Sequence, residues 1–220
     1  MISKPLQPFT EIPAGAFGAW LAAMRASLQG RGGSDVPCGD CVGCCVSSYF
    51  IPIRPEDTAA LDAIPAKFLG SSRPRGHWVM GYREDGTCPM LQSRKCTIYA
   101  HRPQTCRDYD CRVFAAAGMV AGVPDKEVIN ERVRAWRFTY PAETDHAAHR
   151  AVQAAATFIR ERREDFPQGR APTAPTGIAV LAVKVYELFL DETIHQRPAS
   201  EIAAAIVAAA RAFDAAGSAT

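Results

Sequence analysis

The stretch Cys38-Gly-Asp-Cys41-Val-Gly-Cys44-Cys45 dominates the interpretation of this chain of 220 residues. Four more cysteines follow it, and residues 1–37 and 112–220 contain none. In a C-x-x-C spacing a tight turn can aim two sulfur atoms at one point, where both thiolates bind the same metal ion or cluster. The sequence therefore predicts a metal site formed from Cys38, Cys41, Cys44, Cys45, Cys88, Cys96, Cys106 and Cys111.

The composition is that of an ordinary globular protein, with 48% hydrophobic and 22% charged residues. A net charge of +2 gives no electrostatic reason to expect binding to nucleic acid or to an anionic membrane. The first residues lack the apolar core of a signal peptide, and the best apolar stretch, residues 178–190, is interrupted by Lys184 and Glu187. We therefore expect a cytoplasmic protein with no membrane span.

This location affects how the cysteines are interpreted. A reducing cytosol keeps thiols unpaired, which favours metal binding over disulfide formation. The neighbours Cys44 and Cys45 would bond each other only in a strained ring, which also argues against a disulfide network. Disulfides, redox-active thiols and unligated structural cysteines are the alternatives.

The elements around the cysteines are expected to be short. Apolar residues at helical spacing predict a helix over residues 14–28, and the glycine-rich stretch 30–34 then leads into the first cysteines. Strands are expected over 49–53, at a sheet edge because of Pro52, and over 77–82. Residues 87–91 and 96–99 form a predicted hairpin, and helices are expected over 55–63 and 103–114.

Beyond residue 122 the sequence predicts helices only: over 124–163 with an interruption at Pro141, from residue 178, and over 200–215. The expected fold is thus mainly α, of the α+β type. Its expected parts are an N-terminal helix and loop (1–35), a cysteine-cluster metal-binding domain (36–115) and a helical C-terminal region (116–220). The small cysteine-rich region, with its short strands, should pack on the N- and C-terminal helices.

The downstream cysteines lie in a pattern that contains more than spacing. It reads Cys88-Pro-Met-Leu91, then Cys96-Thr-Ile-Tyr99, then Arg102-Pro-Gln-Thr-Cys106-Arg107. Together with CxxCxxCC, this order resembles the YkgJ-type cysteine-cluster family, whose domain is described as zinc- or iron-chelating, over about residues 36–115. Flagellin lysine N-methylases resemble the pattern more distantly.

The resemblance implies that the ligands come from the seven cysteines up to Cys106. Cys111 is a weaker candidate, because a spacing of five residues from Cys106 does not share one face of a regular helix. Four thiolates satisfy one tetrahedral zinc ion or one cubane iron–sulfur cluster, so eight thiols allow two sites. Since adjacent side chains diverge, Cys44 and Cys45 are not expected to bind the same ion.

Basic side chains beside the metal ligands are a further expectation. Thiolate ligands around a metal leave negative charge, which nearby donors must offset. Five basic residues are candidates for this role, with the alternative that most are solvated and only Arg102 and Arg107 are built into the fold: Arg94, Lys95, Arg102, Arg107 and Arg112.

The spacing does not distinguish zinc from an iron–sulfur cluster, because both accept four cysteines. The C-x-x-C-x-x-C run is similar to cluster-binding loops, but Val46 follows Cys45 where bacterial ferredoxins have a C-P pair. We lean to iron–sulfur and keep zinc as the alternative.

Weaker signals are interpreted as structural. His146 and His149 are expected on the surface of a polar helix, since no acidic third ligand stands at motif spacing. The tryptophans Trp20, Trp78 and Trp136 are expected in the core or at interfaces, and Tyr99 is expected to pack over the metal site.

Three functions remain open. The first is a metal-binding protein that holds an iron–sulfur cluster or zinc for metal handling, sensing or electron transfer. The second is a cluster-dependent enzyme, either an oxidoreductase or a methylase-like protein, which should have a substrate pocket with polar residues apart from the thiols. The third is a structural zinc module whose helical region binds a protein partner.

Overall fold

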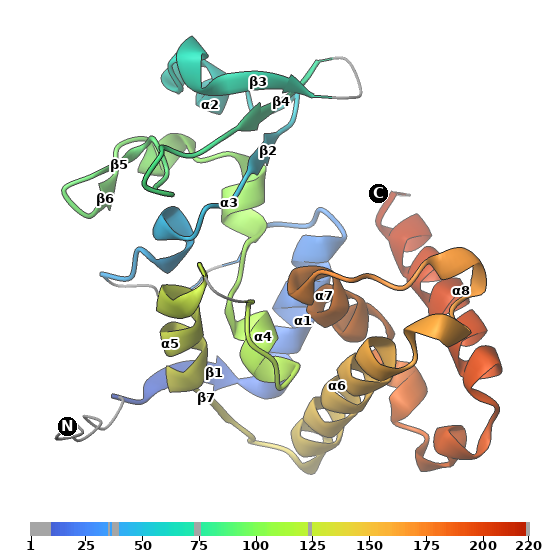
Figure 1. The fold of residues 1–220 in the computed structure, drawn as a ribbon. Coiled ribbons are helices and arrows are strands. Elements are labelled where there is room, and N and C mark those ends of the chain that lie inside the picture. Colours follow the sequence, from blue (N-terminus) through green and yellow to red (C-terminus); the bar gives the residue numbers. More distant parts are fainter. Residues whose placement is uncertain (1–9, 35, 37–39, 73–75, 123–124, 219–220) are drawn as a thin grey trace, which may run out of the picture.

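The computed structural model describes residues 10–34, 36, 40–72, 76–122 and 125–218. Cys38 therefore lies outside the described residues. The chain is mainly helical with three small sheets, which confirms the predicted fold class. The sheets of the cysteine region lie at the top and left of Figure 1, and the long helices gather at the lower right.

The long helices form the larger of two hydrophobic clusters. They are α1 (Phe17–Leu28), α6 (Glu143–Glu161), α7 (Pro175–Val185) and α8 (Ala199–Ser218). Helix α7 packs against both α6 and α8, and α1 packs against α6. Ala155, Ala182 and Ala203 are fully buried in this cluster. Small side chains at these positions let the helices approach closely, and the larger apolar groups fill the space between them.

An unexpected parallel pair of strands joins the N-terminal segment to the middle of the chain. Strand β1 (Ile12–Ala16) pairs with β7 (Trp136–Thr139), with an irregularity between Pro13 and Gly15. Gly15 has φ +91°, a conformation that glycine adopts without steric cost. The helix expected from residue 14 therefore begins only at Phe17, because the preceding residues are held in this pair.

The cysteine region contains the other two sheets. The first has the antiparallel order β2-β4-β3, formed by β2 (Ile51–Ile53), β4 (His77–Met80) and β3 (Leu69–Ser72). Strand β2 is at the edge, as Pro52 predicts; β3 was not expected. The predicted hairpin is present but shorter, with β5 (Leu91–Gln92) and β6 (Lys95–Cys96) joined at two residues of positive φ, Ser93 and Arg94.

Short helices complete the fold. Helix α2 (Thr58–Ala63) lies on the first sheet, and a second, smaller hydrophobic cluster forms beneath it from Ile53, Ala60, Ile64, Met80, Met90 and Ile98. The 3₁₀ helix η1 (Gly43–Val46) carries Cys44 and Cys45. Helix α5 (Glu127–Ala135) contacts η1 and ends at β7, so the described residues 125–163 of the expected helical stretch form two main helices separated by a strand.

The helix expected over 103–114 is two helices, α3 (Gln104–Asp108) and α4 (Arg112–Ala116). The backbone leaves the helical conformation at Tyr109, whose ψ is 115°. Asp110 explains the break: its carboxylate accepts hydrogen bonds from the Arg112 backbone N–H (2.9 Å) and from Trp20 Nε1 (2.9 Å). A buried carboxylate needs such donors, and meeting them requires the chain to turn here.

Two of the three tryptophans are in the core, as expected. Trp20 and Trp136 are buried, but Trp78 is 37% exposed on β4. Trp78 is therefore not a core residue, and its expected place at an interface stays a prediction.

Candidate metal centre

All seven described cysteines line one cavity of about 1010 Å³. The cavity is lined by residues of η1, the β5–β6 hairpin, α3 and α5. The hairpin and α5 lie at the left of Figure 1. The structure thus brings together thiols from four separate segments. They are Cys41, Cys44, Cys45, Cys88, Cys96, Cys106 and Cys111.

The first motif is held from behind by α5. The backbone N–H of Gly43 donates to Cys41 Sγ at 3.4 Å, and the N–H of Cys45 donates to Val42 O at 2.8 Å. A Cβ atom at Gly43 would lie 3.2 Å from Cγ1 of Ile129 and 3.5 Å from Cys41 Sγ. The close approach of α5 therefore favours glycine between the cysteines.

The second motif is tied directly to the first. The Cys88 N–H donates to Cys45 O at 2.6 Å, which joins the two segments through their backbones. Within the second segment, the Thr97 N–H donates to Met90 O at 2.9 Å, so the hairpin folds back beside Cys88. These bonds explain how cysteines far apart in the sequence come to one cavity.

Cys106 and Cys111 reach the cavity from the two sides of the helix break. Cys106 is on α3, whereas Cys111 is the residue before α4 and is only 8% exposed. Trp136 Nε1 donates to Cys111 Sγ at 3.2 Å. The five-residue spacing that made Cys111 a weak candidate does not apply, because no continuous helix joins the two residues.

The thiols influence one another electrostatically. Burial, followed by the charges of Cys44, Cys88 and Cys96, raises the pKa of Cys106 to about 12. Burial raises the pKa of Cys88, with further contributions from Cys96 and Cys44. A hydrogen bond with Cys45, and then burial, raises the pKa of Cys44.

These interactions match the chemistry of a cation site. Several thiols in partial burial resist ionisation as long as no positive charge compensates them, and a bound cation supplies that charge. Within the described ranges, however, no three His, Cys, Asp or Glu side chains stand in an arrangement that holds a metal ion. The donor set therefore fits a thiolate-bound metal by its chemistry, whereas the individual ligands remain predictions.

Cations surround the thiols, and sequence reasoning identified only some of them. Arg102 stacks on the Tyr99 ring at 3.7 Å, and its charge acts on Cys106. Arg83, which the sequence analysis missed, acts on Cys88 while its guanidinium donates to Pro89 O (2.6 Å) and Leu91 O (3.2 Å). The sequence gives no sign of these two Arg83 hydrogen bonds, because Arg83 lies outside the cysteine motifs.

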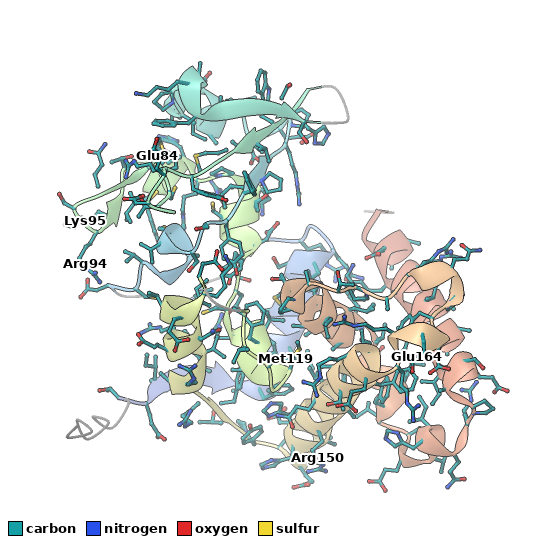
Figure 2. All side chains as sticks on the ribbon, viewed as in Figure 1. Glu84, Arg94, Lys95, Met119, Arg150 and Glu164 are labelled. Atoms are coloured by element: carbon teal, nitrogen blue, oxygen red, sulfur yellow. The ribbon has the colours of Figure 1, made fainter. Side chains whose placement is uncertain are left out.

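The other four expected cations have different roles. Arg107 donates to the carbonyl groups of Arg102 and Ala100, so it is built into the fold. Arg112 forms an ion pair with Asp110 at 2.8 Å. Arg94 and Lys95 extend from the β5–β6 hairpin at the outer edge of the molecule, as Figure 2 shows, and also line the cavity.

A pair of tyrosines on the cavity wall was also missed. The hydroxyl groups of Tyr49 and Tyr109 are 3.2 Å apart, and the ring centroids are separated by 5.5 Å. Lys126 holds its ammonium group 4.4 Å from the centroid of the Tyr49 ring and donates to Ser47 O. Burial raises the pKa values of both tyrosines, so the phenols are neutral.

The remaining candidates have mixed outcomes. His149 is half-buried rather than on the surface: it stacks on Phe17 with centroids 4.4 Å apart, and its Nδ1 is 2.7 Å from the Tyr140 hydroxyl. His146 is exposed and stacks on the same tyrosine. Tyr99 lines the cavity but is 64% exposed, so it lies at the rim rather than over the thiols.

Comparison with known proteins agrees with the cysteine pattern. Residues 37–132 match the model of the family CxxCxxCC, described as a "putative zinc- or iron-chelating domain". The match confirms the cysteine-cluster resemblance, and it ends at residue 132 rather than near 115, so it includes part of α5. Searches of curated proteins and of solved structures found no match. In the described part of the chain, no helix has both the length and the apolar character needed to cross a bilayer.

Proposed function

We propose that this chain, whose residues 37–132 match the CxxCxxCC domain family, is a metal-binding protein that holds an iron–sulfur cluster or zinc through cysteine thiolates. The observation that carries the proposal is the shared cavity, because thiols from η1, the hairpin, α3 and the start of α4 all line it. Grouped thiols of this kind have an obvious common role as metal ligands.

Four of the proposed ligands influence one another electrostatically, although their side chains do not stand in a metal-binding arrangement in this structure. They are Cys44, Cys88, Cys96 and Cys106. The remaining candidates are Cys41, Cys45 and Cys111, which line the same cavity, and Cys38, which belongs to the same motif. Eight thiols leave room for two sites of four ligands each.

The metal determines the role. An iron–sulfur cluster would supply electron transfer or redox sensing, and zinc would supply a structural or metal-handling centre. The cysteines would hold the metal, and Arg102 and Arg83 would offset the negative charge of the thiolates. The surrounding wall would limit the access of water. A cytoplasmic location, which keeps thiols reduced, is part of this proposal.

The deciding experiment is purification without oxygen, followed by elemental analysis and a visible spectrum. Iron and sulfide together with a broad brown absorption are the expected result, and stoichiometric zinc in a colourless protein would select the zinc alternative. A protein that contains neither metal, and takes up neither when reconstituted, would contradict the proposal.

A second candidate, a cluster-dependent oxidoreductase or methylase-like enzyme, is favoured by the lining of the cavity. An enzyme needs polar groups other than the metal ligands, and Tyr49, Tyr109, Arg102 and Thr176 line the same space as the thiols. By contrast, a structural zinc site is closed, and this volume is at the upper end of the 300–1,000 Å³ typical of small-molecule pockets. A purely structural module with a protein partner on its helices is therefore the third choice.

A further inference from the structure

The cavity beside the thiols is larger than a metal centre needs. Its volume is about 1010 Å³, whereas a metal ion bound by four thiolates fills the space between its ligands. The thiols occupy part of the wall, and the remainder is formed by apolar, aromatic and basic side chains. This remaining part has the character of a site for a second, organic ligand.

The charges on the wall specify the sign of that ligand. The basic side chains that line the cavity are Arg94, Lys95, Arg102 and Arg132, against one carboxylate, that of Asp40. Arg102 is the most informative of these. Its Nε donates to Tyr99 O at 3.0 Å and its plane stacks on the Tyr99 ring, yet no ion pair joins it to any carboxylate in the described part of the chain.

Arg102 is also fixed in position. Stacking on Tyr99 and the Nε hydrogen bond orient the guanidinium group, so its terminal amino groups are presented in one geometry. A planar fork of donors held in this way suits a carboxylate, sulfonate or phosphate group. The charge acts on Cys106, which places it beside the thiols rather than out in solvent.

The tyrosine pair supplies a second polar contact. Two phenols that share one hydrogen bond use only one of their two protons for it. Thr176 interacts with Tyr49, so the hydroxyl groups form a short chain on the cavity wall. Three hydroxyl groups joined by two hydrogen bonds keep one proton, at one end of the chain, that can be donated to an acceptor in the cavity.

Apolar side chains define the body of the ligand. Phe50, Met80, Met90 and Ile98 also line the cavity. Phe50 and Tyr99 are the two most exposed large apolar side chains in the described part of the chain, at 62% and 64%, and both line this cavity. Exposed aromatic groups that line a cavity favour a ligand with an apolar or aromatic part.

We propose that this cavity binds a small organic anion with an apolar or aromatic body, whose negative group is held by Arg102 and whose polar atoms contact the Tyr49–Tyr109 pair. The inference rests on the proposed function, since the ligand lies beside the proposed metal centre. It assigns the organic part of the cavity a role of its own, as a substrate or sensing site.

The test uses anilinonaphthalene sulfonate, an aromatic anion, with the protein as purified without oxygen. Titration by fluorescence should show one probe molecule bound per chain. Phenylnaphthylamine, which has a similar aromatic body without the anionic group, should bind more weakly. Arg102→Gln should weaken binding of the anionic probe by about tenfold and leave binding of the neutral probe unchanged.

Matched variants separate the site from general effects of charge and folding. Arg160→Gln removes the same charge from an exposed position on α6 and should bind both probes as the unaltered protein does. Tyr109→Phe keeps the ring in place and removes one hydroxyl, and should weaken binding of the anionic probe by about threefold. Tyr82→Phe, which alters an exposed tyrosine outside the cavity lining, should have no effect.

Metal content is measured on the same samples, so the two proposals fail separately. No binding of the anionic probe to metal-loaded protein, or equal binding by Arg102→Gln, would overturn the organic-anion site alone. A metal-free protein that binds the probe in the expected pattern would support this site and overturn the metal centre. If Arg102→Gln does not fold, as judged by its melting curve, the Tyr109→Phe and Tyr82→Phe comparison decides the inference.

Discussion

Cys106 and Cys111 are five residues apart, and both line one cavity because the backbone turns between them at Tyr109 and Asp110. Sequence spacing alone could not reveal this, since the turn depends on hydrogen bonds that Asp110 makes with Trp20 and Arg112. The same carboxylate therefore shapes both the core and the position of a candidate ligand.

Replacing single cysteines should rank their roles. Cys44→Ser and Cys106→Ser should lose bound metal and lower the stability of residues 40–111, because thiolate–metal bonding then contributes to folding. Cys111→Ser should retain most of the metal, since Trp136 already donates to this sulfur. Elemental analysis and thermal melting would measure both effects.

Two outcomes would contradict that ranking. Unchanged metal content and melting in Cys44→Ser and Cys106→Ser would remove both residues from the ligand set. A loss in Cys111→Ser as large as that in Cys106→Ser would make Cys111 a ligand of equal rank.

His149 should make stability depend on pH. Burial lowers its pKa below 6.5, so the unfolded chain takes up a proton at a higher pH than the folded chain does. The free energy of unfolding should therefore fall as the pH falls below 6.5, and be independent of this group well above it. His149→Gln should flatten this part of the profile in denaturant titrations between about pH 5 and 7.5.

His195→Gln provides the comparison for His149. His195 is exposed near Phe189, so this substitution is the matched change at a histidine outside the helix core. An identical slope in His149→Gln and the unaltered protein would show that His149 does not govern this dependence.

At the scale of elements, the sequence predicted what local chemistry determines. The hairpin that ends at Cys96, the edge position of β2 and most of the helices on either side of the cysteine region were confirmed, because turns, prolines and apolar spacing act within a few residues. The β1–β7 pair was missed, since parallel pairing of distant segments leaves no local pattern. The cavity and its tyrosine pair were missed for the same reason: they form only after long-range packing.

Asn130 connects two of these elements. Its Oδ1 accepts from the Ala121 N–H at 2.8 Å, and its Nδ2 donates to Gly122 O at 2.8 Å, so this buried side chain ties α5 to the segment that follows α4. Asn130→Ala should lower the free energy of unfolding by about 2 kcal/mol, because it leaves the buried Ala121 N–H and the half-buried Gly122 carbonyl group without this partner.

Glu131→Ala is the matched change on the same helix, since Glu131 is exposed. Its effect should stay within about 0.5 kcal/mol in chemical denaturation. Equal effects of the two substitutions would mean that the Asn130 hydrogen bonds do not hold α5 in place.

At the scale of the whole molecule, the two hydrophobic clusters differ greatly in size. The larger includes side chains from α1, α4, α5, α6, α7 and α8, whereas the smaller consists of six buried residues and their partly buried neighbours around the β2-β4-β3 sheet. So small a cluster contributes limited stability, and small folds of this kind depend on metals or cross-links.

Removal of the metal should therefore affect the two clusters unequally. Treatment with a strong chelator should increase hydrogen exchange and proteolysis in residues 40–111, while the segments of α6, α7 and α8 stay protected. Mass spectrometry of exchanged or cleaved protein resolves these segments. Uniform loss of protection along the chain, or none anywhere, would show that the metal does not stabilise the cysteine region selectively.

The β1–β7 pair has a consequence for the order of events during synthesis. Its first strand leaves the ribosome well before its partner, because the cysteine region and α5 are translated between them. At a typical rate the delay is on the order of ten seconds. The thiols thus emerge before β1 and β7 can pair. Metal can then bind to the nascent chain while the strands on either side of the cysteine region are still unpaired.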